Sequence, residues 1–349
     1  MGSLSTANVE FCLDVFKELN SHSAGDNIFF SPLSLLYALS MILLGARTRS
    51  AEQMEKVLHF NHVVGPLKSD FQDSSKQYLN CSEKIYGARL QTVDFEHSPE
   101  EARQTINAWV ESQTNGKVTD LFQRGTIDPS SIMVLVNAIY FKGQWQYKFQ
   151  ERETTKAPFE LSEGKSVTVE MMYQSGIFKL AFIKEAQLQV LELPYVNNIL
   201  SMLILLPVGT AKLEQIEEQL NLKTFQQWTS PSNLMEREVE VHIPRFKLEM
   251  TYEMNSLLKS LGMTDIFDQR KADLSGMSPA KTMHLSKVIH KSYVDVNEAG
   301  TEAAAATGDV IVVKRLPIRA QFLANRPFLF FIRHTHTNTI LFCGKFASP

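Results

Sequence analysis

The sequence predicts a single α+β unit, and three observations favour this class. Strand-like segments come in clusters, helical patterns lie mostly in the first third of the chain, and no linker or low-complexity tract divides the 349 residues. The regular alternation of strand and helix that is typical of a doubly wound parallel sheet is not seen. The length alone would allow two domains, but the chain is 44% apolar and can bury one large core. We therefore expect one domain over residues 1–349, with large antiparallel or mixed sheets.

An amphipathic helix is predicted near the N-terminus. Apolar residues recur there at helical spacing, and charged residues such as Asp14 and Lys17 stand between them. This pattern is typical of a helix that lies on the surface of a domain and turns one stripe toward the core. The stripe consists of Val9, Cys12, Leu13, Phe16 and Leu19.

Residues 28–46 carry no charge and approach the length of a membrane span. They also contain three serines and a proline, and they begin with the strand-like run Ile28-Phe29-Phe30. We therefore expect a buried strand that continues into a buried helix rather than a transmembrane segment.

A second helix is predicted after Ser98. A capping serine, Pro99 at the first helical position and Glu101 three residues after the serine are a helix-start signature. Asn115-Gly116 is a stop signal. The apolar stripe expected on this helix consists of Ala102, Ile106, Trp109 and Val110.

The strands are predicted from alternating or continuous apolar runs. Val239, Val241 and Ile243 alternate with polar residues and should share one face of a sheet. The two runs at the end of the chain are apolar enough to be mostly buried. The expected strands are Ile132–Phe141, Gln189–Leu193, Leu200–Leu206, Val239–Leu248, Ile289–Val296, Phe328–Ile332 and Thr339–Phe346.

The charge and the cysteines narrow the class of function. A net charge of −3 and a pI near 6.3 give no general attraction to nucleic acid or to an anionic membrane. Cys12, Cys81 and Cys343 are an odd number without zinc or redox spacing, which suits a reducing compartment. The N-terminus shows no cleavable signal. We expect a cytoplasmic monomer.

Catalytic and cofactor motifs are missing from the sequence. Neither a nucleophile elbow nor a phosphate-binding or dinucleotide loop is present. The pairs His334/His336 and His59/His62 lack a nearby Cys or carboxylate at known ligand spacing. We therefore expect no metal, no cofactor and no enzymatic activity.

The segment from Glu298 to Asp309 consists mostly of small residues, and the dibasic step Lys314-Arg315 follows it. In an extended conformation, alternate residues of this segment would line opposite faces, and small side chains could enter a packed sheet without displacing large neighbours. The alternative is an exposed Ala-rich helix. Gly300 and Gly308 bracket only seven residues, which is short for an isolated helix, so a mobile loop fits better.

Five characteristic stretches are spread along the chain: Asn27–Ser34, Ile106–Val110, Thr114–Val118, Val136–Gly143 with Trp145, and Pro327–Ile332. They resemble signatures of the serpin family, and in particular its intracellular, ovalbumin-like clade. The resemblance covers most of the sequence. It implies three β-sheets with about nine helices, an exposed reactive loop over residues 298–322 and suicide inhibition of serine proteases.

The resemblance also implies roles for individual residues. Counting in the family register from Gly300 places the scissile bond at Lys314-Arg315, and Arg315-Leu316 is the neighbouring alternative. A lysine or arginine there suits a trypsin-like protease. The resemblance places the start of insertion near Trp145 and Arg245, with an ion pair between Arg245 and Glu298. The residues expected to control opening of the sheet are Ser31, Ser34, Asn137 and His290. The residues of the loop hinge are Glu298, Gly300, Thr301, Glu302, Ala303, Ala304, Ala305 and Ala306.

The chain departs from the family pattern in one large respect. About forty residues are missing after Phe60, and they would normally supply two helices and an internal strand of the main sheet. Smaller departures are Thr48 in place of a common glycine, Arg326 in place of histidine, and Asp309 in the loop. The shortened sheet leaves an alternative function open, that of a non-inhibitory serpin that is cleaved as a substrate or acts as a binding protein.

Overall fold

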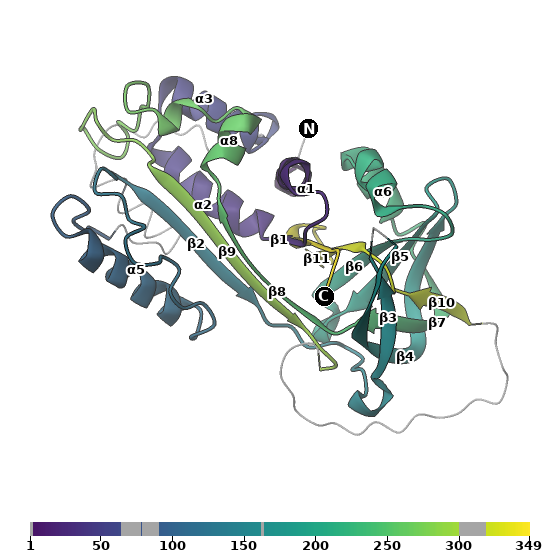
Figure 1. The fold of residues 1–349 in the computed structure, drawn as a ribbon. Helices are drawn as coiled ribbons and strands as arrows, with labels where there is room; N and C mark the ends of the chain where they lie inside the picture. Colours follow the sequence, from purple (N-terminus) through teal and green to yellow (C-terminus); the bar gives the residue numbers. More distant parts are fainter. Residues whose placement is uncertain (1–2, 64–77, 79–90, 162–163, 300–318) are drawn as a thin grey trace. The chain divides into compact units, whose positions relative to one another are not determined.

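A computed structural model describes residues 3–63, 78, 91–161, 164–299 and 319–349. Within these residues the fold contains seven α-helices and four short 3₁₀ turns (Figure 1). None of the described helices is both long and apolar enough to cross a bilayer. The helices are α1 Leu4–His22, α2 Pro32–Gly45, α3 Thr48–Val57, α5 Pro99–Gln113, α6 Leu213–Gln219, α7 Leu222–Trp228 and α8 Asn255–Leu261; the turns are η1 Phe60–His62, η3 Glu151–Glu153, η4 Val196–Asn198 and η5 Asp265–Phe267.

The described strands form two hydrogen-bonded sheets. The larger has nine strands in the order β1-β12-β11-β6-β5-β4-β7-β10, with β3 paired to β4; the smaller has the order β2-β9-β8. The long strand β4 pairs with β5 at one end and with β3 and β7 over the rest of its length. It therefore connects the strands on either side of it into one continuous sheet. The strands are β1 Ile28–Phe30, β2 Val134–Phe141, β3 Thr155–Glu160, β4 Ser166–Ile183, β5 Leu188–Pro194, β6 Leu200–Pro207, β7 Met235–Pro244, β8 Phe246–Glu253, β9 Lys287–Val296, β10 Ala320–Leu323, β11 Phe328–His334 and β12 Ile340–Phe346.

The chain divides into two compact units that alternate along the sequence. The first unit comprises residues 1–19, 30–140 and 249–293, and the second comprises residues 20–29, 141–248 and 294–349. The boundary falls inside α1, β1, β2, β8 and β9, so neither unit is a continuous stretch of chain.

The core of the second unit is rich in aromatic side chains from β11 and β12. Phe328, Phe330 and Phe346 are essentially buried, and the ring of Phe246 lies 4.5 Å from that of Phe346. Gly344 faces Phe330 so closely that a Cβ atom there would lie 2.2 Å from the ring. The prediction of two mostly buried C-terminal strands is therefore confirmed, and Gly344 is needed where the ring packs on the backbone.

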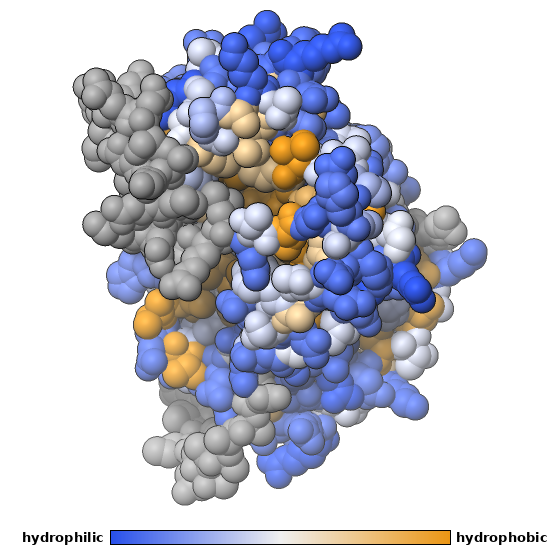
Figure 2. All heavy atoms as spheres, turned by 90° about the vertical axis from the view of Figure 1, so that its left-hand side faces the viewer, coloured by the Kyte–Doolittle hydropathy of each residue, from blue (hydrophilic) through white to orange (hydrophobic). Residues whose placement is uncertain are grey.

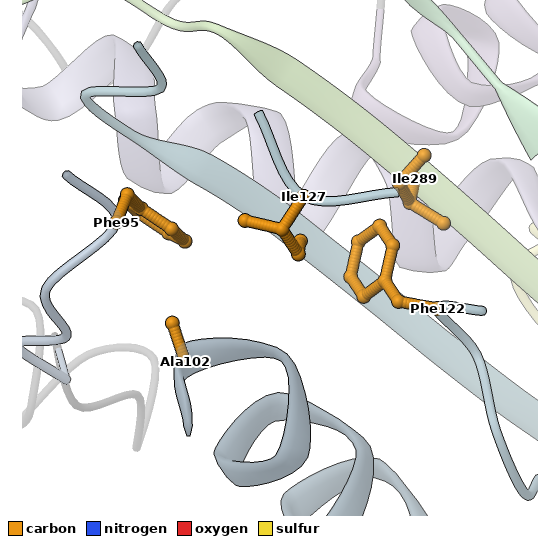
Figure 3. Packing of buried hydrophobic residues seen from close by; sticks show 5 residues of the cluster. All are labelled: Phe95, Ala102, Phe122, Ile127 and Ile289. Atoms are coloured by element: carbon orange, nitrogen blue, oxygen red, sulfur yellow. The ribbon is translucent and has the colours of Figure 1, made fainter. Parts of the chain in front are cut away.

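A cluster in the first unit packs α5 and the segment after it against β2 and β9 (Figure 3). Its members are nearly buried, and Val134 and Val136 of β2 pack against them. The cluster therefore contacts both strands of a neighbouring pair in the smaller sheet. Its members are Phe95, Ala102, Phe122, Ile127 and Ile289.

The predicted helices are present, with two local corrections. Ser98 precedes α5 but makes no side-chain capping bond. The side chain of Trp109, predicted to lie in the buried stripe, is 43% exposed, because Ala102 and Val110 cover the inner side of α5. The expected stop is confirmed, since Asn115 and Gly116 both have positive φ.

The predicted strand Val239–Leu248 is in fact two strands. β7 ends at Pro244 in the larger sheet, and β8 begins at Phe246 in the smaller one. Arg245 between them donates its backbone N–H to Glu170 O. The sequence analysis did not predict strands β3, β4 and β10 or the helices α3, α6, α7 and α8.

The face shown in Figure 2 is mainly hydrophilic, with hydrophobic atoms gathered in a few separate areas. Single exposed apolar residues such as Tyr37 (49% exposed) are ordinary on a folded protein. The buried strand and helix expected over residues 28–46 are confirmed as β1 and α2, although α2 keeps one exposed side.

Thr48 has a φ of +48°, a left-handed conformation that a β-branched residue rarely adopts. We expect Thr48→Gly to raise the free energy of unfolding by about 1 kcal/mol in urea denaturation, because the steric cost of Cβ is removed. Thr48→Ala is the control. It loses the same 2.9 Å hydrogen bond from Thr48 Oγ1 to Asp273 Oδ2 but keeps Cβ. An equal gain from alanine would contradict this account.

Candidate functional site: a loop anchor and a buried polar cluster

The first part of the candidate site holds the chain directly after β9. The side chain of Glu298 is buried, and its Oε1 accepts a hydrogen bond from Thr154 Oγ1 at 2.7 Å. Arg245 Nη1 lies 3.3 Å from Oε1 and 3.4 Å from Oε2, which is the expected ion pair. The backbone also takes part, because Phe149 N donates to Glu298 O at 2.9 Å. Glu298 is thus fixed through both its side chain and its backbone.

Trp145 fixes the residues on either side of Glu298. Its indole Nε1 donates to Asn297 O at 2.9 Å, and its backbone N donates to Ala299 O at 3.2 Å. The indole is buried and stacked on Tyr195, with ring centroids 4.5 Å apart. Burial raises the pKa of Tyr195 well above its ordinary value, so the stack stays neutral. We name Trp145, Phe149, Thr154, Arg245 and Glu298 the loop anchor.

The ion pair contributes little to the strength of the loop anchor. The side chain of Arg245 is 43% exposed, and an ion pair at such a site is worth roughly 0–1 kcal/mol. The hydrogen bonds to buried groups matter more, because an unpaired buried carboxylate or carbonyl costs about 1–3 kcal/mol. The anchor therefore holds the chain as far as Ala299, mainly by hydrogen bonds.

The second part of the candidate site is a polar cluster in the first unit, formed by Ser31, Ser34, Asn137 and His290. His290 Nδ1 lies 2.6 Å from Asn137 Oδ1, and Ser31 N donates to His290 Nε2 at 3.0 Å. Ser34 Oγ donates to Asn137 Oδ1 at 2.9 Å and accepts from Asn137 Nδ2 at 2.7 Å. Ser31 Oγ accepts from Ser34 N and so caps the start of α2. The four residues expected together do lie together.

These hydrogen bonds require neutral His290. Because the Ser31 N–H points at Nε2, this nitrogen is an acceptor, and the proton resides on Nδ1, which donates to Asn137 Oδ1. The ring is fully buried, and desolvation lowers its pKa from 6.5 to about 3. A second proton would place two donors, Nε2–H and Ser31 N–H, against each other.

We expect the neutral state of His290 to make stability fall in acid. The folded pKa lies below the unfolded value, so the contribution is fully present above pH 6.5 and is lost as the pH falls from 6.5 toward 3. The slope from this one group is at most about 1.4 kcal/mol per pH unit. Urea denaturation at pH 7 and pH 5 measures it. His290→Gln removes the titrating group and should show a smaller loss between the two values; equal losses would rule out this source.

The other predicted site residues lie outside the described residues. These are the hinge positions Gly300, Thr301, Glu302 and Ala303–Ala306 and the reactive bond Lys314-Arg315. Of the described chain, no group of three or more His, Cys, Asp or Glu side chains is placed to hold a metal ion. Cys12 and Cys343 are both buried, and neither forms a disulfide within the described residues.

Sequence reasoning missed several residues of the site. Thr154 and Phe149 bind Glu298 through a hydroxyl and a backbone N–H, and Tyr195 stacks on Trp145; such groups occur throughout the sequence. The residue before Glu298, Asn297, was also missed, although its Oδ1 accepts from Ala299 N at 3.1 Å. An asparagine directly after a predicted strand was the one available signal for a turn there.

The chain anchored directly after β9 and the polar cluster around His290 of β9 contain residues to which the family resemblance assigned roles. The family model described as Serpin (serine protease inhibitor) matches residues 6–77 and 67–349. The chain therefore belongs to the serpin family of serine protease inhibitors.

The relatives place the chain in the ovalbumin-like clade. It is 69% identical to human Serpin B11 and 46% identical to horse leukocyte elastase inhibitor, with all of each chain covered. The crystal structure of uncleaved ovalbumin superimposes with a TM-score of 0.89 at 35% identity, again over the whole of both chains. The expected family, clade and fold class are therefore confirmed.

The same comparisons locate the missing segment. The alignment with human Serpin B11 has 392 positions and this chain has 349 residues, so 43 positions have no counterpart here. The two segments matched by the family model meet at residues 67–77, which places the gap after Phe60, as expected.

Proposed function

We propose that the chain inhibits a trypsin-like serine protease as a suicide substrate. The protease serine attacks the carbonyl carbon of Lys314, an ester forms between them, and the Lys314-Arg315 bond breaks to leave a new amino terminus on Arg315. The freed segment then inserts between β2 and β9 with the enzyme still attached. This proposal goes beyond the family membership in naming the bond, the class of enzyme and the mechanism.

The loop anchor is the observation that carries the proposal. Glu298 is held at a fixed point, and the segment after it contains Thr301 and four consecutive alanines, Ala303–Ala306, which a packed sheet can accept. About 14 inserted residues at roughly 3.3 Å each would carry the bound enzyme about 45 Å. A segment tied at both ends could not move its far end in this way, so cleavage is the trigger.

The backbone energetics favour insertion. β2 and β9 are neighbours in the smaller sheet, so an inserted strand exchanges one hydrogen-bonded ladder for two. The net gain is one ladder, and about ten bonds at about 1 kcal/mol each give roughly 10 kcal/mol. This gain does not depend on the strand that is missing from the chain, because that strand would not touch the inserted one.

The missing strand affects how β2 is held while it separates from β9. Among the described residues β2 has β9 as its one neighbour in the sheet. Val134 and Val136 pack against the cluster around Phe122, so α5 and the segment after it hold β2. Ile289 of β9 belongs to the same cluster, so opening the sheet also requires these contacts to rearrange.

Mixing the chain with trypsin tests the proposal. The expected result is a covalent complex that survives SDS, with a shortened chain as the minor product. Complete cleavage without complex would overturn the inhibitory mechanism. The melting temperature before and after cleavage of the loop gives a second measurement, because insertion should raise it by more than 10 °C for a gain of roughly 10 kcal/mol.

A second function is favoured by the shortened sheet, namely a non-inhibitory serpin that proteases cleave as a substrate or that acts as a binding protein. The 43 positions absent from the alignment and the three-stranded order of the described smaller sheet both support it. Cleavage without any rise in the melting temperature is the result that this function requires. For either function we propose a monomer, and we place it in the cytoplasm because the cysteine usage suits a reducing compartment.

A further inference from the structure

The solvent face of β4, β7 and β10 carries a row of glutamates. In the β4–β7 register, Lys179 lies opposite Glu236, Ile177 opposite Glu238 and Ser175 opposite Glu240. Residues directly opposite each other share a face, so the three glutamates and Ile177 point the same way. Along β7 the glutamates recur at every second residue, roughly 7 Å apart. We call Glu236, Glu238, Glu240 and Ile177 the acidic row.

The acidic row has an excess of negative charge. Arg319 lies 3.7 Å from Glu240 and 4.0 Å from Glu238, so it offsets part of this charge. Lys179 is engaged by the buried Glu192 at 3.7 Å. Within the row, Ile177 is 64% exposed, the largest exposure of any large hydrophobic side chain among the described residues. An exposed apolar residue among carboxylates is typical of a contact surface for a basic partner.

The position of the row relative to the reactive bond limits what can cover it. Arg319 follows Lys314 by five residues, which span at most about 18 Å. A trypsin-sized domain has a radius of gyration of about 17 Å, so its diameter of roughly 45 Å is much larger than this tether. A protease that holds Lys314 in its active site therefore lies against the surface around Arg319, where the acidic row begins.

We propose that the acidic row is a second contact surface for the protease, selecting enzymes with basic residues beside the active-site cleft. This inference rests on the proposed function and adds a second criterion for which protease is bound. Lys314 selects a protease by its specificity pocket, and the acidic row selects it by the charge of the surface around its active site. The glutamates raise the association rate by electrostatic steering, and Ile177 slows dissociation by burying apolar surface on the enzyme.

The test uses trypsin whose active-site serine is replaced by alanine, so that binding is measured without acylation or insertion. Association and dissociation rates are compared for the unmutated chain, E236Q/E238Q/E240Q, and a control E52Q/E214Q/E218Q, which removes the same charge from exposed residues of α3 and α6. Cationic and anionic trypsins serve as two ligands with the same specificity pocket and opposite surface charge.

At low salt we expect the row variant to associate about tenfold more slowly with cationic trypsin and the control to change less than twofold. High salt should remove the difference, and anionic trypsin should not show it. Ile177→Ser should speed dissociation severalfold at an unchanged association rate.

Equal rates for the row variant and the control would overturn the proposal that the acidic row contacts the protease, while leaving the proposed function intact. Faster association of the row variant would also overturn it, since the glutamates would then hold the basic Lys314-Arg315 step of this same chain. If the unmutated chain binds neither trypsin, the trypsin-like specificity in the proposed function fails as well.

Discussion

Replacing Lys314 with glutamate is expected to slow the reaction of the chain with trypsin by about a hundredfold to a few thousandfold. A trypsin-like specificity pocket ends in a carboxylate, which pairs with a lysine or arginine side chain in a site with little water. Lys314→Glu removes this pair and sets two carboxylates against each other. Loss of a charged partner in a buried site typically costs about 3–5 kcal/mol, and each 1.4 kcal/mol is tenfold in rate. The measurement is the second-order rate of loss of trypsin activity.

Two matched variants separate the possible positions of the reactive bond. Lys314→Arg keeps the charge and should react at a rate near that of the unmutated chain. Arg315→Glu places the same new charge one residue further on and should have a much smaller effect if Lys314-Arg315 is cleaved. If Arg315→Glu is the more damaging change, Arg315-Leu316 is the reactive bond, and the mass of the released C-terminal peptide will agree.

The sequence predicted those elements whose burial follows one regular period. The helix α1 and the strands β5, β6, β9, β11 and β12 keep one pattern throughout their length, so period and apolar content were enough. β4 was missed because its eighteen residues change environment along the strand. It is half-exposed beside β3 and β7 and mostly buried beside β5, so no single alternation describes it.

The division between β7 and β8 could have been read from a change of phase. Val239, Val241 and Ile243 are buried at odd positions, whereas Phe246 and Leu248 are buried at even ones. A strand cannot change phase without a break, because a shift of one residue turns every side chain to the other face. Pro244 stands at this point and has no N–H to donate to a ladder.

The candidate site was predicted by resemblance and not by pattern. Asn137 and His290 are 153 residues apart, and nothing in the spacing of either says that they form a hydrogen bond. The neutral tautomer of His290 is set by a backbone N–H that only the fold brings to it. Thr154 was missed for the same reason, since its hydroxyl acts on Glu298 from 144 residues away.

Replacing Thr301 with arginine is expected to convert the chain from an inhibitor into a substrate. Thr301 is the third residue after Glu298, which the loop anchor holds in place, so it enters the sheet at the start of insertion. An arginine at an entering position must leave water, and a buried unpaired charge costs several kcal/mol. A rise of about 3 kcal/mol in the barrier slows insertion by about two orders of magnitude, and water then hydrolyses the ester before the enzyme is trapped.

The measurement is the fraction of trypsin recovered as SDS-stable complex at a fixed ratio of the two proteins. We expect Thr301→Arg to lower this fraction at least tenfold, while the loop is cleaved at the same bond and at a similar rate. Thr301→Val keeps the shape of threonine without its hydroxyl and should trap trypsin as well as the unmutated chain. Equal trapping by the arginine variant would mean that Thr301 never enters the sheet, and the enzyme would then have to be held by some means other than strand insertion.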